Sequence, residues 1–198
     1  MGNPFKAMIM GYFLPLLAAG IVAIVPDYDV LFVKWAAAIF VILLVMPIVL
    51  SFRFPSNKQK AYRLTLMFQL YAFTFFFTFP LLKMVKENII FQLLLLIVFI
   101  SIYYLARYDQ QTEVPIVYPD EDKEKKWIAY VYYAIPILLI ILGFGGNYII
   151  TRTAFQIFGD EFMFPYLSII LYLLSCWLLF LLSSVAYKSH VKEGYLEK

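Results

Sequence analysis

Six long apolar stretches fill most of this 198-residue chain, and each is long enough to cross a bilayer as a helix. They cover residues 7–25, 31–50, 64–85, 89–106, 127–145 and 163–187. About 20 apolar residues in a helix cross the hydrocarbon core, and a helix pairs its own backbone polar groups where no water is present. The sequence therefore predicts an all-α integral membrane protein. Residues 1–198 form a single domain in this interpretation, a bundle of six transmembrane helices.

The composition agrees with this class of protein. Charged residues make up 15% of the chain and hydrophobic residues 64%, whereas an ordinary soluble domain has about 25% charged residues. Cys176 is the one cysteine, which excludes an internal disulfide and cysteine-rich metal sites. The net charge of +3 is explained by membrane orientation, so we expect the lipid bilayer as a partner and no nucleic acid.

Lysine and arginine are concentrated on one side of the predicted bundle. If the N-terminus is cytoplasmic, three basic residues are external (Lys83, Lys86 and Arg152) and Lys34 lies near the outer end of the second helix. Twelve are internal: Lys6, Arg53, Lys58, Lys60, Arg63, Arg107, Lys123, Lys125, Lys126, Lys188, Lys192 and Lys198. Cytoplasmic loops retain positive charge during insertion. We therefore expect both termini in the cytoplasm and a multi-pass protein of the cell (plasma) membrane.

The external segment 147–162 is too polar to span a membrane and too long to be a turn. Gly143, Gly145 and Gly146 end the fifth helix, and aromatic residues then recur at near-helical spacing. This pattern predicts a short amphipathic helix on the outer surface. It leaves open whether the helix contacts lipid or closes a cavity as a lid.

Prolines fall inside four of the predicted spans, at Pro15, Pro47, Pro80 and Pro136, and Pro165 falls in the first turn of the last one. An interior proline removes one backbone hydrogen bond and can kink a helix. Kinked helices can frame a cavity, but membrane helices also tolerate proline without a functional role.

The sequence does not predict an enzyme. An ionisable residue in the middle of a span is the usual sign of a proton path or catalytic centre, and none is found there. Lys34 and Lys83 are close enough to the outer surface to extend their amines into water. His190 is the one histidine and lies beyond the last span. We expect no catalytic residues, no cofactor and no bound metal.

Polar and small residues within the spans suggest where helices or ligands meet. Gln69 and Gln92, and the threonines Thr74 and Thr78, can hydrogen-bond between helices. A small-molecule ligand is compatible with the two glutamines, which makes them candidates for lining a cavity. The first span carries Gly11, Ala19 and Ala23, and such small residues let another helix approach closely. A membrane-protein partner is one use of that face, and packing within the bundle is the other.

Two functions are compatible with these features. The first is a non-enzymatic protein that acts by helix–helix contact, as an accessory or regulatory subunit or as an immunity-type protein against a membrane-active toxin. The second is small-molecule transport. In size, in its six spans with cytoplasmic termini and in the Ala19-x-x-x-Ala23 pair, the chain resembles the substrate-binding subunits of energy-coupling-factor vitamin transporters. That resemblance implies that the first helix docks a coupling subunit and that Trp35, Tyr148 and Tyr166 at the outer mouth stack on a ligand ring.

Overall fold

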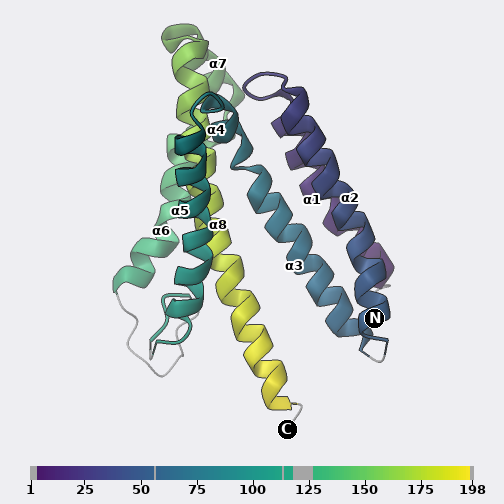
Figure 1. Cartoon of the computed structure of the whole chain (residues 1–198). Coiled ribbons are helices and arrows are strands. Elements are labelled where there is room, and N and C mark those ends of the chain that lie inside the picture. Colours follow the sequence, from purple (N-terminus) through teal and green to yellow (C-terminus); the bar gives the residue numbers. More distant parts are fainter. Residues whose placement is uncertain (1–3, 56, 113, 118–126, 197–198) are drawn as a thin grey trace. The chain divides into compact units, whose positions relative to one another are not determined.

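The computed structural model describes residues 4–55, 57–112, 114–117 and 127–196. For residues 4–10 and 189–196 it describes the backbone alone, so the side chain of His190 lies outside the described part. Every regular element among the described residues is a helix (Figure 1). The chain divides into two compact units, residues 1–84 and 85–198. The prediction of an all-α fold is confirmed.

Unit 1 is built from three long helices and one short one: α1 (Pro4–Ile24), α2 (Val30–Arg53), α3 (Lys58–Phe76) and α4 (Phe79–Met84). Helix α3 packs against both α1 and α2. Asp29 begins α2 by accepting a 2.9 Å hydrogen bond from the backbone N–H of Leu31, and Asn57 does the same for Lys60 of α3 at 3.0 Å. These side chains satisfy backbone donors that a helix leaves unpaired at its start.

The predicted span 64–85 is two helices rather than one, with a turn at Phe77 and Thr78. Pro80 has no N–H, so it cannot bond the carbonyl four residues earlier, and its ring disfavours a continuous helix. Thr78 stabilises the break, because its hydroxyl donates a 2.7 Å bond to the carbonyl of Phe75. The break carries α4, and with it Lys83, to the end of unit 1.

Unit 2 contains α5 (Ile89–Asp109), α6 (Trp127–Leu142), the short 3-10 helix η1 (Phe144–Gly146), α7 (Tyr148–Phe158) and α8 (Asp160–Leu196). Helices α5, α6 and α7 each pack against α8. Helix α8 begins at Asp160, three residues before the predicted span. Pro165 therefore lies in the second turn of α8, and its placement in a first turn was wrong.

Four helical segments among the described residues are long and apolar enough to cross a membrane: Val30–Arg53, Lys58–Met84, Ile89–Asp109 and Asp160–Lys188. Two shorter apolar helices, Gly11–Ile24 and Trp127–Leu142, accompany them. In the apolar windows of α2 and α5, 17% of the residues are buried within the protein. Such exposed apolar faces need lipid or protein to cover them, which supports an all-helical membrane-embedded protein.

Candidate functional site: buried polar groups of the two units

Lys83 is the most unusual charged residue of unit 1, because it is buried, with 4% of its surface exposed. Its ammonium donates hydrogen bonds to the backbone carbonyls of Val22, Val25 and Asp27, the last two at 3.2 and 2.9 Å. The ring of Phe32 lies 6.0 Å from the same nitrogen. The amine is therefore turned toward the end of α1, rather than reaching solvent as the sequence led us to expect.

Helix chemistry explains why this lysine is tolerated in an apolar environment. The last carbonyls of a helix have no donor within it and carry partial negative charge, which favours a cation. The carbonyl of Val22 also lacks a helical donor because residue 26, four positions later, is a proline without an N–H. Lys83 thus ties α4 to the end of α1.

A second buried polar group lies in the core of unit 1, where Gln69 of α3 meets Gly11 of α1. Gln69 is 1% exposed, and its amide nitrogen and oxygen make no hydrogen bond of normal geometry to the described residues, although the Tyr12 hydroxyl of α1 is near enough to interact with this amide. A Cβ atom added at Gly11 would lie 2.1 Å from the Gln69 Oε1 atom. Only glycine fits at that position without displacing the glutamine, so α1 and α3 are in close contact here.

The buried seam of α1 runs through Pro15, Ala18 and Val22, which continue from Gly11 at intervals of four, three and four residues. Ala19 and Ala23 are half-buried beside this seam. They share a helix flank with Tyr12, which bonds α2. Of the predicted helix-contact residues, Gly11 therefore meets α3, whereas Ala19 and Ala23 lie beside the fully buried seam rather than in it.

At two of the prolines within the spans, a side chain of another helix donates a hydrogen bond to the carbonyl that the proline leaves unpaired. Tyr12 donates a 3.0 Å hydrogen bond from its hydroxyl to the carbonyl of Leu43, whose helical donor would have been residue 47, a proline. In unit 2, Trp177 Nε1 donates at 2.9 Å to the carbonyl of Tyr132, four residues before Pro136. Neighbouring helices thus satisfy the carbonyls that proline leaves without a backbone donor.

Tyr132 and Trp177 also hold α6 against α8 by their rings. The ring centroids are 5.4 Å apart with an interplanar angle of 24°, so the rings are stacked. The hydroxyl of Tyr132 returns a 3.3 Å bond to the carbonyl of Trp177. The sequence did not reveal this pair, because the partners are 45 residues apart.

The remaining predicted ligand residues are not gathered inside either unit. In unit 1, Trp35 is exposed at the surface of α2. In unit 2, Tyr148 is exposed, Gln92 is half-buried on α5, and Tyr166 uses its hydroxyl to bond the carbonyl of Leu142 at 2.9 Å. Of the five candidates, Gln69 is thus the fully buried one.

A buried carboxylate at the end of α5 was not predicted. Both oxygens of Asp109 accept from the backbone N–H of Ile116, at 3.0 and 3.1 Å, and Gln110 donates to one of them. Val117 is completely buried. Asp109 therefore folds the segment 114–117 back onto unit 2.

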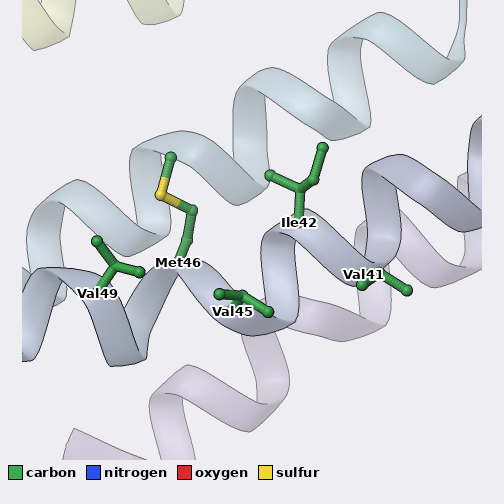
Figure 2. Close-up of a pocket in the computed structure, with 5 residues that line it drawn as sticks. All are labelled: Val41, Ile42, Val45, Met46 and Val49. Carbon is green, nitrogen blue, oxygen red and sulfur yellow. The ribbon is translucent and has the colours of Figure 1, made fainter.

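One side of α2 carries a shallow, open groove of about 280 Å³. Its lining comes from α2 itself, namely Val41, Ile42, Val45, Met46 and Val49. Figure 2 shows these five side chains along one helix, with the Met46 sulfur as the one atom other than carbon among their side-chain atoms. The groove offers no polar group to a ligand, so it suits an apolar partner.

Comparisons with protein-family models, with curated proteins and with solved structures gave no match. The function is therefore inferred from the residues described above.

Proposed function

We propose that this chain is a non-enzymatic, multi-pass membrane protein that acts by helix–helix contact, as an accessory or regulatory subunit or as an immunity-type protein. The observation that carries the proposal is the uncovered aliphatic groove on α2. Its occupant is an apolar transmembrane helix of a partner protein.

The spacing of the groove residues supports this occupant. Val41, Val45 and Val49 form one row at intervals of four residues, and Ile42 and Met46 form a parallel row beside it. Helices pack when such a row from one helix fits between two rows of another. Valine has a stiff side chain in a helix, so little conformational freedom is lost on contact.

The proposal includes six spans with both termini on the cytoplasmic side of the cell (plasma) membrane. The two shorter apolar helices, Gly11–Ile24 and Trp127–Leu142, raise the number of spans from four to six. The unequal distribution of lysine and arginine supports the orientation. Labelling of single cysteines at Lys58 and Arg152 in intact cells with a membrane-impermeant maleimide tests it, since only Arg152→Cys is predicted to react.

Tryptophan substitution in the groove tests the contact function. Val45→Trp places a large ring in the groove, whereas Ile97→Trp makes a comparable change on the exposed surface of α5. We expect tagged protein purified from native membranes in mild detergent to retain a membrane-protein or toxin-like partner with Ile97→Trp and to lose it with Val45→Trp. Equal recovery of the partner by both variants would exclude the groove as the contact surface.

Transport is the second candidate, and Gln69 is the observation that favours it. A buried amide without a hydrogen bond of normal geometry to the described residues is a polar group that a small ligand in unit 1 could bind. In this alternative the protein acts as a transporter component similar to an energy-coupling-factor substrate-binding subunit. Recovery of an ATPase and a coupling membrane subunit in the same purification would favour it, and their absence alongside another membrane protein would favour the contact function.

A further inference from the structure

Helix α7 lies at the end of unit 2 where α5 and α8 begin and α6 ends. Tyr166 of α8 bonds the carbonyl of Leu142, the last residue of α6. Tyr172 bonds the carbonyl of Leu95 at 2.7 Å, and α5 and α8 run in the same direction (Figure 1). Tyr172 and Leu95 are therefore level with each other. Tyr166 and Ile89 each lie six residues earlier, so the start of α5 is level with Tyr166, because both helices rise by the same distance per residue. Helix α7 begins six residues after α6 ends, with η1 between them, and lies at this end of unit 2 (Figure 1).

Polar residues gather at the same end of unit 2, as expected at a membrane boundary. Asn88 caps α5 and Asn147 caps α7, each with its side-chain oxygen. The charged residues there are Lys86, Glu87, Arg152, Asp160 and Glu161. The sequence thus changes from apolar to polar at the level where α7 is found.

The surface of α7 is divided between a covered line, an apolar flank and a polar flank. Ala154 is buried, and Phe155 packs edge-on against Phe164 of α8 with ring centroids 5.3 Å apart. Ile150, Ile157 and Phe158 border the covered line and form the exposed apolar flank, at 50, 70 and 58% exposure. Tyr148 and Ile149, each 72% exposed, lie in the first turn outside this flank. Arg152 and Gln156 lie on the far side of the helix and form the polar flank, and Thr153 lies between it and Ile157; all three are exposed.

Aromatic rings extend the apolar flank of α7 onto α8. Phe158 lies 5.8 Å from Phe162, and Phe162 stacks at 6.1 Å on Tyr166, measured between ring centroids. Tyr166 in turn lies 6.1 Å from the ring of Phe144. The rings therefore form a continuous apolar surface from α7 to the level at which α6 ends. Tyr166 is of a residue type that is enriched at the boundary of a bilayer.

We propose that α7 is an interfacial helix that contacts the outer surface of the lipid bilayer. Ile150, Ile157 and Phe158 enter the boundary between headgroups and acyl chains, and Arg152 and Gln156 face water and headgroups. This inference rests on the proposed membrane insertion of unit 2. It chooses lipid contact over a lid, because a lid would have to bury the same apolar flank against protein.

Site-directed spin labelling separates these arrangements. Cys176, the one native cysteine, is replaced by alanine, and single cysteines are introduced by Ile150→Cys, Ile157→Cys, Arg152→Cys and Gln156→Cys. The labelled proteins are reconstituted into vesicles of phosphatidylcholine and phosphatidylglycerol. Collision of each label with oxygen, which concentrates in lipid, is compared with collision with a water-soluble nickel chelate. Ile137→Cys, on the exposed surface of α6 and more than one turn from its end, is the control for insertion of unit 2.

The expected result is a helical periodicity in accessibility. Labels at 150 and 157 meet oxygen severalfold more than nickel, and labels at 152 and 156 show the reverse. If all four labels on α7 meet nickel equally, the helix stands in water and the proposal is overturned. If labels at 150 and 157 meet neither reagent, protein covers them and the lid is correct. A nickel-accessible label at 137 would instead contradict the membrane insertion of unit 2.

Discussion

Replacing Lys83 with methionine tests the most unusual contact of unit 1. Methionine keeps the length and much of the apolar volume of the lysine stem but removes the ammonium. Three carbonyls lose their donor, at Val22, Val25 and Asp27. Asp27 is exposed and Val25 is partly exposed, so water can replace the amine at those two. Val22 is completely buried, and Pro26 offers it no N–H.

The magnitude follows from that one buried carbonyl together with the ammonium. A buried acceptor left unpaired costs about 1–3 kcal/mol, and a hydrogen bond to a charged group contributes about 1.5–3 kcal/mol. Methionine also avoids the several kcal/mol, roughly, that burial of an ammonium costs, which offsets much of the loss. We therefore expect Lys83→Met to lower the free energy of unfolding by about 2 kcal/mol, or about 30-fold in the folding equilibrium.

The assay is equilibrium unfolding in mixed micelles with a rising fraction of sodium dodecyl sulfate, followed by circular dichroism and tryptophan fluorescence. Lys34→Met is the matched control, because Lys34 is an exposed lysine of α2 in the same unit. Surface substitutions of this kind change stability by about 0.5 kcal/mol or less. If Lys83→Met and Lys34→Met unfold at the same detergent fraction, the ammonium does not stabilise the end of α1 and the reasoning is wrong.

Three further predictions use the same buried polar groups. Gly11→Ala should lower the free energy of unfolding by about 1–2 kcal/mol through overpacking, and adding Gln69→Ala should restore part of it; if the double variant is no more stable than Gly11→Ala, the two residues do not clash. Trp177→Phe should cost about 1 kcal/mol in the native chain and less in a Pro136→Ala chain, where residue 136 supplies a backbone donor to the same carbonyl; an equal loss in both would show that proline does not matter to this bond. Asp109→Ala should speed amide hydrogen exchange in residues 114–117, measured by mass spectrometry, and unchanged exchange would mean that the carboxylate does not hold that segment.

Much of the fold could be predicted from the sequence because membrane insertion depends on local properties. Length and hydropathy located the apolar helices. The break between α3 and α4 was missed, although Pro80 was recognised. Whether a proline bends a helix or divides it depends on what stabilises the turn. Here Thr78 supplies a side-chain bond that hydropathy does not register.

The buried polar contacts were much less predictable, because each joins residues far apart in the chain. A proline in a span predicts an unpaired carbonyl four residues earlier, so Leu43 and Tyr132 could have been named as acceptors from the sequence. The donors could not, because Tyr12 is 31 residues from Leu43 and Trp177 is 45 residues from Tyr132. Aromatic residues near span ends are adequately explained by interfacial anchoring, and nothing local distinguishes an anchor from a donor.

The prolines within the spans therefore do not by themselves indicate a cavity, which was one of the two interpretations of the sequence. A kinked helix frames a cavity only if the released carbonyl is left for a ligand, whereas at Leu43 and Tyr132 a neighbouring helix already supplies the donor. Pro15 is the instructive further case, since the carbonyl it releases belongs to Gly11, the residue in closest contact with Gln69. The amide of Gln69 makes no hydrogen bond of normal geometry to the described residues. Because Gly11 and Gln69 are in close contact, a polar ligand could reach this amide only if α1 and α3 separated, so these two residues test transport more directly than any aromatic residue at the surface.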